Sequence, residues 1–434
     1  MLYYSTRKQS EPVDLEYAVL KGLADDGGLY MPQSIRQLPN EFWKQLPHLG
    51  LEETGYIVAS SFLGDTIPEK ELKKICYDSL SFEIPLVKIE ENIFTLELFH
   101  GPTMAFKDVG ARFMSRLMGF FLEKKQQNLK VIVATSGDTG SAVAAGFFNV
   151  PGIEVYVLFP KNKVSPLQQK QITTWGGNIK ALEINGTFDD CQDLAKEALA
   201  DKYLNSKFLL TSANSINIAR LLPQSFYYFY AAAQLNYTYK PLVFSIPSGN
   251  FGNLSAGLLA QKMGLKVGRF IAATNINDVV PVYFRTSEYS PKPSQQTISN
   301  AMDVGNPSNY ARMMELFEHN YNKFKESIYA CSFSDEQTQQ AISKLSDKHN
   351  YLPDPHGAVA WLGAKEYLEK ENPDANVVFL ETAHPAKFPE TLPLYLKMQG
   401  SLPEQLRTIE HKKEVFTSLP NDYPQLKELL MEEN

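Results

Sequence analysis

The sequence has few cysteines, and they are far apart. Three occur among the 434 residues, at Cys76, Cys191 and Cys331. An odd and sparse set argues against a disulfide framework and is typical of proteins kept in a reducing compartment. We therefore expect a cytoplasmic protein without structural disulfides.

Long apolar runs and an excess of basic residues are also missing. No stretch approaches the ~20 apolar residues of a membrane span, and residues 1–11 lack the apolar run of a secretory signal. Lysine and arginine total 42 against 49 aspartates and glutamates, which gives a net charge of −7. Nucleic acid and anionic membranes require a basic surface, so neither is an expected partner. A small anionic substrate stays compatible with this charge, because one local site can be positive within an acidic protein.

The chain also lacks the short motifs of common hydrolases and nucleotide-binding proteins. It contains no HExxH, CxxC or nucleophile-elbow pattern, which leaves metal and serine hydrolases without support. It has no P-loop, and the pair Gly249 and Gly252 lacks the third glycine of the dinucleotide fingerprint. No metal ion is expected.

The chain has the composition of a large α/β protein and the alternation of strand and helix patterns that is typical of one. Hydrophobic residues make up 44% and charged residues 21%, which is ample for a sizeable core. Residues 1–82 show helical patterns, at 14–23, 39–46 and 68–79. From residue 83 onward short apolar strands alternate with helices, which predicts doubly wound, mostly parallel sheets with helices on both faces.

The length and the change of rhythm suggest an accessory N-terminal region followed by two α/β domains. The expected regions are 1–82, 83–215 and 216–434. Within the third region, we expect one long helix at 216–235, a long loop or inserted lobe at 278–302, and a charged helical tail from Pro393 to Asn434.

One lysine has an unusual setting. Lys107 directly follows Met104, Ala105 and Phe106. A lysine amine can form an imine with an aldehyde such as that of pyridoxal phosphate, but it must be neutral to attack. Apolar neighbours favour the neutral form by desolvation. Taken alone, the pattern is more typical of a solvated lysine at a helix start.

Three loops are predicted to lie beyond the carboxyl ends of strands, where doubly wound sheets bind ligands. They are residues 135–141, 247–253 and 380–388. Glycines and hydroxyls at a helix start can bind an anion through backbone N–H groups, and the helix dipole adds to this. Each of the first two loops, taken alone, is also compatible with a capped tight turn.

Taken together, these segments resemble one family. Residues 99–108 are similar to the cofactor-lysine segment of the threonine synthases, which are fold-type II pyridoxal phosphate enzymes. The three loops, the stretch Gly28–Pro32 and the segment 211–220 resemble parts of the same family. The resemblance runs in order from Leu15 to about Lys397, which is nearly the whole chain.

The resemblance implies a fold-type II α/β protein that binds pyridoxal 5'-phosphate through Lys107, which then acts as the catalytic acid and base. Asp138 would lie near the phenolic oxygen of the cofactor. Thr382 would place its hydroxyl at the pyridine nitrogen. The cofactor phosphate would be bound by five consecutive residues, namely Gly249, Asn250, Phe251, Gly252 and Asn253.

The substrate residues are implied in part by the same resemblance. Three residues would surround the substrate carboxylate, namely Ser136, Gly137 and Thr139. Asn217 and Arg220 are three apart and share one helix face, which suits a second phosphate, and Ser165 or Lys163 would assist. A capped helix with a surface arginine is the competing interpretation of the pair.

The loop 380–388 departs from the family at Glu381, where relatives often have a small residue. Surface or capping roles are the simplest expectation for His384 and Lys387. A lone histidine in a turn is most often a structural hydrogen-bonding group, and this is the expectation for His356.

The activity implied by the resemblance is that of a lyase that converts O-phospho-L-homoserine and water into L-threonine and phosphate. A threonine or serine dehydratase of the same fold, and a phospho-lyase that stops at a keto acid, stay open as alternatives. The N-terminal region and the phosphate pair disfavour a dehydratase but not a phospho-lyase. A protein that only binds the cofactor is disfavoured by Lys107 and the full set of loops. The expected partner is a small-molecule substrate, and the sequence indicates no oligomeric state.

Overall fold

The computed structural model describes residues 1–235, 240–392 and 403–432, and these divide into two compact units. Unit 1 consists of Met1–Gln33, Lys107–Arg220 and Leu402–Asn434, and unit 2 consists of Ser34–Phe106 and Leu221–Ser401. Each unit gathers segments that are far apart in the sequence. The division therefore differs from the expected continuous regions, because residues 1–82 contribute to both units. Part of the expected tail, residues 393–402 and 433–434, lies outside the described residues.

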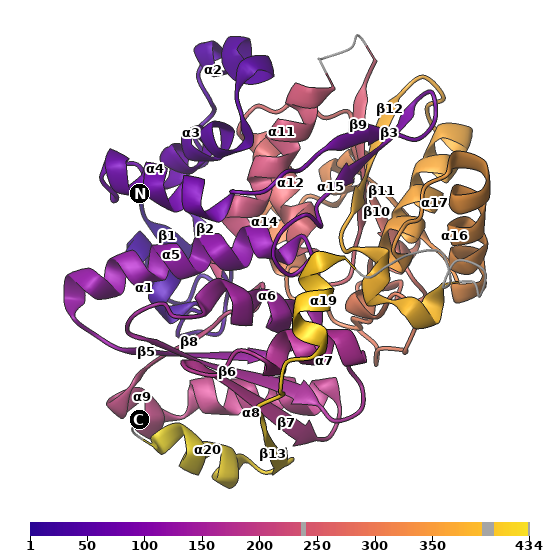
Figure 1. Ribbon diagram of the computed structural model, residues 1–434. Helices are drawn as coiled ribbons and strands as arrows, with labels where there is room; N and C mark the ends of the chain where they lie inside the picture. Colours follow the sequence, from indigo (N-terminus) through magenta and orange to yellow (C-terminus); the bar gives the residue numbers. More distant parts are fainter. Residues whose placement is uncertain (236–239, 393–402, 433–434) are drawn as a thin grey trace. The chain divides into compact units, whose positions relative to one another are not determined.

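Unit 1 contains a five-stranded sheet, a two-stranded sheet and the helices around them (Figure 1). Its elements are β1 Tyr3–Ser5, α1 Leu15–Lys21, β2 Tyr30–Pro32, α5 Lys107–Lys125, β5 Leu129–Ala134, α6 Asp138–Phe147, β6 Ile153–Pro160, α7 Pro166–Thr173, β7 Ile179–Asn185, α8 Phe188–Ala200, α9 Lys202–Lys207, β8 Leu209–Ser212, α10 Ile218–Leu221, α19 Glu404–Glu410, β13 Thr417–Pro420 and α20 Tyr423–Met431.

The five-stranded sheet has the order β13-β7-β6-β5-β8, and every neighbouring pair is parallel. All six residues of β5 are buried, as expected for a parallel strand covered on both faces. Helices α8 and α20 lie on one face, and α6 and α7 lie on the other (Figure 1). The expectation of a purely helical tail is wrong, since β13 extends this sheet by pairing with β7.

The N-terminal segment of unit 1 is partly as expected. Helix α1 begins after Asp14, whose side chain accepts a hydrogen bond from Tyr17 N, and it ends at Gly22, where φ is 78°. The sequence pattern had predicted both ends of this helix. The strands β1 and β2, which pair antiparallel, were not expected.

Unit 2 contains a six-stranded sheet between two layers of helices. Its elements are α2 Asn40–Gln45, η1 Leu46–His48, α3 Leu51–Leu63, α4 Glu69–Ser79, β3 Leu86–Lys88, β4 Ile93–Glu97, η2 Leu222–Ser225, α11 Phe226–Gln234, β9 Leu242–Pro247, α12 Gly252–Lys262, β10 Arg269–Thr274, α13 Val279–Thr286, η3 Asn300–Met302, α14 Tyr310–Leu316, α15 Tyr321–Ser327, β11 Ile328–Ser332, α16 Asp335–His349, α17 Pro355–Lys370, β12 Asn376–Glu381, η4 Pro385–Lys387 and η5 Pro389–Thr391.

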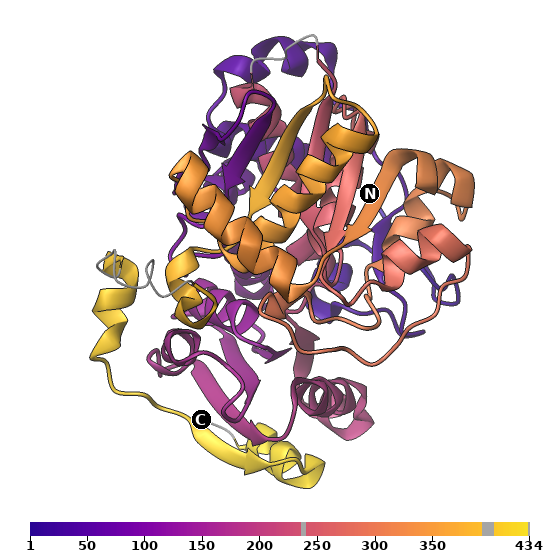
Figure 2. The same cartoon turned by 90° about the vertical axis from the view of Figure 1, so that its right-hand side faces the viewer.

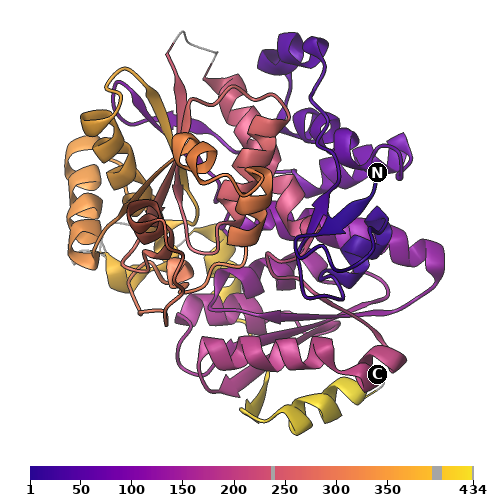
Figure 3. The ribbon, with the colours of Figure 1, turned by 180° about the vertical axis from the view of Figure 1, so that it is seen from behind.

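The strand order in unit 2 is β11-β10-β9-β12-β4-β3, and all neighbouring pairs are parallel except β3 with β4. Helices α16 and α17 lie along one face of the sheet (Figure 2), where α17 packs across β10, β9 and β12. Helices α11 and α12 lie on the opposite face, seen from behind in Figure 3. The predicted α/β class with mostly parallel sheets is confirmed.

Several predicted boundaries from residue 216 onward differ from the structure. The expected single helix at 216–235 is divided into α10, the 3₁₀ turn η2 and α11, because Pro223 cannot donate the hydrogen bond that a continuous α-helix needs at that position. The expected loop or inserted lobe at 278–302 contains α13. Helix α3 and strand β11 were not expected.

Candidate cofactor and substrate site

Two helices of unit 1 begin at residues that the sequence had singled out. Lys107 is the first residue of α5 and Asp138 is the first residue of α6. The Nζ atom of Lys107 lies 4.0 Å from Oδ2 of Asp138, and the two side chains are 16% and 4% exposed. A lysine amine and a carboxylate thus meet in a nearly closed environment at two helix N-termini.

The loop before α6 is shaped by its own hydroxyl and by Gln168. Thr135 Oγ1 accepts hydrogen bonds from Gly137 N at 2.9 Å and from Gly140 N at 2.8 Å. Gly137 has φ 143° and makes no side-chain cap for α6. Gln168 Nε2 donates to Asp138 Oδ1 at 2.8 Å, so one oxygen of this carboxylate is bound within the loop region and the other faces Lys107.

In unit 2, the segment that leads to Lys107 is bound to the loop after β12. Phe106 N donates to Thr382 O at 2.9 Å, His384 N donates to Met104 O at 3.1 Å, and Ala105 forms an antiparallel bridge with Ala383. The chain position immediately before the lysine is therefore fixed to Thr382, whose residue surface is 6% exposed.

The loop after β9 leads into α12 in the way that anion sites require. Phe251, the N-cap residue, adopts a left-handed conformation with φ 59° and makes no side-chain capping hydrogen bond. The N–H groups at the start of α12 are thus left uncapped by that side chain, which fits a bound phosphate. A Cβ atom at Gly249 would lie 2.7 Å from Met302 Cα and 2.8 Å from Ala301 O, so only glycine fits there.

A set of polar residues on and next to α14 supports this loop from behind. Asn250 Oδ1 accepts hydrogen bonds from Ser308 N and Oγ, and Asn309 Nδ2 donates to Asn250 O at 3.0 Å. Arg312, which is fully buried, donates from Nη1 to Asn309 Oδ1 at 2.8 Å. Burial lowers the pKa of Arg312 to about 9, so the guanidinium still carries its charge at neutral pH.

The sheet of unit 2 brings two of the predicted loops to one edge. Strands β9 and β12 are parallel neighbours, with Ser245 opposite Phe379. Continuing this register places the ends of both strands at the same level, so the loops that contain Gly249 and Thr382 start side by side. The sequence had predicted that all three loops follow the carboxyl ends of strands. Two of them share this edge, whereas the loop 135–141 follows β5 in the sheet of unit 1.

The residues predicted for a second phosphate have partners within unit 1. Asn217 Nδ2 donates to Val19 O at 2.9 Å, and its Oδ1 accepts from Ala219 N. Arg220 is 4% exposed and donates to Ala213 O at 2.9 Å. Burial lowers its pKa to about 10, while the nearby Asp108 acts in the opposite direction. Arg220 is thus not the surface arginine of the competing interpretation.

Ser165 and the remaining predicted residues are placed by local structure. Ser165 is the N-cap of α7, where its Oγ accepts from Gln168 N at 3.3 Å. His384 is confirmed as a capping residue, since Nδ1 accepts from Ala386 N, and burial lowers its pKa to about 4. Lys387, in contrast, is fully buried and donates to Thr103 O at 2.9 Å.

Sequence reasoning missed a buried acidic cluster beside Thr382. Asp354, His356 and Glu381 are each at most 2% exposed. His356 is structural, as expected, with Nδ1 2.6 Å from Asp354 Oδ1. The only sequence signals were the unusual Glu381 and the family-like stretch around His356, and neither signal specified that these side chains meet.

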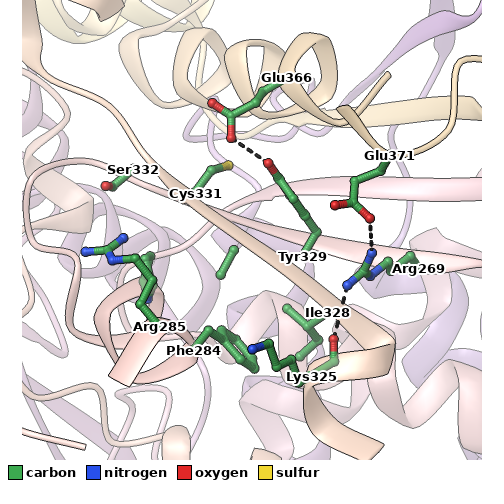
Figure 4. A pocket seen from close by; sticks show the side chains of 12 residues that line it. Arg269, Phe284, Arg285, Lys325, Ile328, Tyr329, Cys331, Ser332, Glu366 and Glu371 are labelled. Carbon is green, nitrogen blue, oxygen red and sulfur yellow. Dashed lines mark hydrogen bonds and ion pairs between the residues drawn. The ribbon is translucent and has the colours of Figure 1, made fainter. Parts of the chain in front are cut away.

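A pocket of about 570 Å³ lies elsewhere in unit 2 (Figure 4). It is lined in part by Arg269, Arg285, Tyr329 and Glu366, and its charges are largely matched, as Arg269 pairs with Glu371 at 2.7 Å. None of the predicted site residues lines it. Within the described ranges, no cluster of three or more His, Cys, Asp or Glu side chains is arranged for a metal ion. No helix in the described part of the chain has both the length and the hydropathy of a membrane span.

Three family models match the chain and together cover almost all of it. The family described as "Pyridoxal-phosphate dependent enzyme" matches residues 83–383. The family described as "Threonine synthase N terminus" matches residues 2–80, and the one described as "Threonine synthase, C-terminal" matches residues 357–430.

Full-length relatives agree with these matches. The chain is 42% identical to the threonine synthase of Escherichia coli (strain K12) over 432 residues, which is 99% of each chain. The crystal structure of the Escherichia coli enzyme has a TM-score of 0.92 and covers 99% of both chains. The pyridoxal phosphate-bound threonine synthase of Brucella melitensis is 34% identical with a TM-score of 0.92, covering 99% of this chain and 98% of that one.

Proposed function

The chain belongs to the threonine synthase family of pyridoxal phosphate-dependent enzymes, and we propose that its Lys107 carries the cofactor and moves protons during the reaction. The enzyme is a lyase that converts O-phospho-L-homoserine and water into L-threonine and phosphate. Bound pyridoxal phosphate supplies an electron sink for negative charge that develops at the substrate Cα.

The single observation that carries the proposal for Lys107 is its pairing with Asp138 at two helix N-termini. Lys107 is the first residue of α5, its side chain is 16% exposed, and its Nζ lies 4.0 Å from Asp138 Oδ2, so a carboxylate is placed to stabilise the ammonium charge when a proton arrives. An amine in such an environment can take the proton from the substrate Cα and later return it.

The remaining cofactor contacts are proposed from the two loops of unit 2. The uncapped start of α12, with Gly249, Asn250, Phe251, Gly252 and Asn253, would bind the cofactor phosphate. Arg312 donates to Asn309, which donates to Asn250, so the buried charge of Arg312 would add positive potential to this loop. Thr382 would meet the ring nitrogen with a neutral hydroxyl, and Asp138 in unit 1 would lie near the phenolic oxygen.

The substrate contacts are proposed from the loop before α6. Ser136, Gly137 and Thr139 stand at a helix start without a side-chain cap, which suits a carboxylate. A direct role for Asn217 in binding the substrate phosphate has less support, because its amide is occupied by Val19 O and Ala219 N. Arg220 and Ser165 remain our candidates for contacts with the substrate phosphate. The Michaelis constant of an Arg220→Lys variant tests the role of Arg220.

The proposal is tested by cofactor absorbance together with product analysis on O-phospho-L-homoserine. We expect an imine absorbance band, and equal amounts of threonine and phosphate. Phosphate accompanied by a keto acid would favour the phospho-lyase alternative. Absence of the imine band after addition of pyridoxal phosphate would contradict the assignment of the site.

A further inference from the structure

The acidic cluster beside Thr382 is more than a buried polar patch, because one carboxylate in it binds two separate segments. Asp354 is the N-cap of α17 and is fully buried. Its Oδ1 accepts from His356 N and Gly357 N and lies 2.6 Å from His356 Nδ1. Its Oδ2 accepts from Ala383 N at 2.7 Å.

The Ala383 contact fixes the ring side of the candidate cofactor site. Ala383 follows Thr382 in the chain and forms the bridge with Ala105, while Thr382 O holds Phe106 N. Asp354 therefore fixes the backbone next to Thr382. At the same place, this loop is hydrogen-bonded to the segment that ends at Phe106.

The His356 contact reaches the phosphate side. His356 Nε2 accepts from Ala301 N at 3.2 Å, so its Nδ1 carries the proton that it donates to Asp354. Ala301 and Met302 form the wall against which Gly249 packs without room for a Cβ atom. The imidazole thus ties Asp354 to the wall of the phosphate loop.

Glu381 completes the cluster as a neutral group. Its Oε1 accepts from Asp354 N, and a Cβ atom at Gly357 would overlap Oε2, so the glycine makes room for this side chain. Burial, and next the charge of Asp354, raise the pKa of Glu381 well above its ordinary value. Four donors face the two oxygens of Asp354, and hydrogen bonds to a carboxylate are stronger than those between neutral groups.

We propose that Asp354 is a positioning residue that holds the Thr382 loop directly and the wall of the Gly249 loop through His356, so that both loops meet the same cofactor in register. The proposal rests on the assignment of these two loops to the ring nitrogen and the phosphate of pyridoxal phosphate. It assigns to Asp354 no contact with the cofactor.

The test compares two ligands on the full-length apoenzyme, pyridoxal 5'-phosphate and pyridoxal, which lacks the phosphate. Imine absorbance gives the dissociation constant of each, and nitrogen-15 NMR of labelled cofactor reports the ring nitrogen. Asp354→Asn should weaken both ligands on the order of tenfold or more and shift the ring-nitrogen signal, since one charged acceptor of four donors is lost. His356→Phe, which keeps a ring in the same volume, should weaken pyridoxal phosphate but leave pyridoxal unchanged.

Glu381→Gln is the matched control, because a neutral amide can replace a neutral carboxyl and still accept from Asp354 N. It should change neither dissociation constant. Wild-type affinities and ring signal in Asp354→Asn would overturn the proposal, and so would an equal loss for both ligands in His356→Phe. If Asp354→Asn does not fold, the ratio of the two affinities in His356→Phe decides alone.

The same titration separates this proposal from the assignment on which it rests. If the wild-type protein binds pyridoxal as tightly as pyridoxal phosphate, the Gly249 loop does not bind the phosphate, and the assignment fails before the role of Asp354 is tested. If the wild-type protein prefers the phosphate and the variants behave like it, the assignment stands and the positioning role fails.

Discussion

The two helix starts proposed to bind anions, at α6 in unit 1 and at α12 in unit 2, use different means to the same end. Both lack a side-chain cap from the residue that precedes the helix, and both preceding residues have positive φ, 143° at Gly137 and 59° at Phe251. Helix α6 has a carboxylate in its first turn, Asp138, which lies beside Lys107. Helix α12 has no acidic residue in its first turn, and the loop before it is supported by the buried cation Arg312.

This difference suits two different ligands. A site that must release its product should not bind an anion too tightly, and Asp138 reduces the positive potential at the start of α6. A site that retains its cofactor gains from every positive contribution, and the start of α12 has the helix dipole together with Arg312. We propose that similar local geometry is adjusted by charge, so that the first loop exchanges substrate and product while the second retains the cofactor.

The largest expected effect comes from the lysine beside the first loop. Lys107→Ala removes the amine that we propose to bind the cofactor and to move the proton, so turnover should fall by at least ~1,000-fold and the imine band should vanish. Steady-state kinetics and an absorbance spectrum measure both. Lys202→Ala, which changes an exposed lysine of the same unit, is the control and should keep both. A Lys107 variant that retained the band would show that another lysine carries the cofactor.

The second loop can be broken at Gly249. In Gly249→Ala the new methyl group would meet the backbone of Met302 at 2.7 Å, and overpacking of this kind costs about 1–3 kcal/mol. We expect pyridoxal phosphate to bind up to ~100-fold more weakly, while pyridoxal is little affected. Gly119→Ala, on helix α5, meets only a side-chain carbon at 3.3 Å and serves as the control. Equal affinities of Gly249→Ala and the wild type would remove this loop from the phosphate site.

Thr382, which directly follows strand β12, can be given a charge by a change in its side chain alone. Thr382→Asp should keep the pyridine nitrogen protonated, raise its pKa and lower turnover more than tenfold, whereas Thr382→Ser should keep most of the activity. Nitrogen-15 NMR on labelled cofactor reports the protonation directly. If the aspartate variant leaves both the nitrogen shift and turnover unchanged, Thr382 does not contact the ring.

A parallel change at Gly137 sharpens the comparison of the two loops. Gly137→Ala is strained because φ is 143°, and its Cβ atom would approach Gln168 Cδ at 2.5 Å. The Michaelis constant for O-phospho-L-homoserine should rise about fivefold to tenfold, with the affinity for pyridoxal phosphate unchanged. Weaker binding of pyridoxal phosphate with an unchanged Michaelis constant would be the opposite result, and it would exchange the roles that we give to the two loops.

The smallest effect concerns stability and its dependence on pH. Burial and the nearby carboxylates Asp354 and Glu97 raise the pKa of Glu381 in the folded state. The folded state therefore binds more protons than the unfolded state above the ordinary pKa of a glutamate, and stability falls as pH rises through that range. Glu381→Gln removes this loss.

The midpoint of thermal unfolding of Glu381→Gln should exceed that of the wild type by about 2–4 °C at pH 7, with the difference shrinking toward pH 4, as a change of about 1 kcal/mol would give. Scanning calorimetry at several pH values measures it. Glu326→Gln, an exposed carboxylate on α15, should show no such dependence. A difference that grew as the pH was lowered would contradict the sign of the shift.

Most of the fold could be predicted because its signals are local. Buried parallel strands such as β5 and β9 consist of apolar residues interrupted by a single polar one, and helix α1 carries its own N-cap and C-cap residues. Helix α5, by contrast, includes a glycine, Gly110, close to its start at Lys107. The structure explains this glycine, since a Cβ there would lie 2.9 Å from Arg220 O.

The parts that could not be predicted depend on distant residues. Strand β13 forms only because β7, more than 200 positions earlier in the sequence, offers it an edge. The meeting of Asp354, His356 and Glu381, and the burial of Lys387 against Thr103 O, likewise depend on packing between α17, β12 and the loop before Lys107. A buried charge has no local pattern that distinguishes it from an exposed one.

The central claim, that Lys107 binds the cofactor, is tested most directly by chemical reduction. The holoenzyme is treated with borohydride, which converts the imine into a stable secondary amine, and then digested and analysed by mass spectrometry. We expect the pyridoxyl phosphate group on the peptide that contains Lys107 and on no other peptide. A pyridoxyl phosphate group on a different lysine, in a preparation that makes threonine from O-phospho-L-homoserine, would contradict the account.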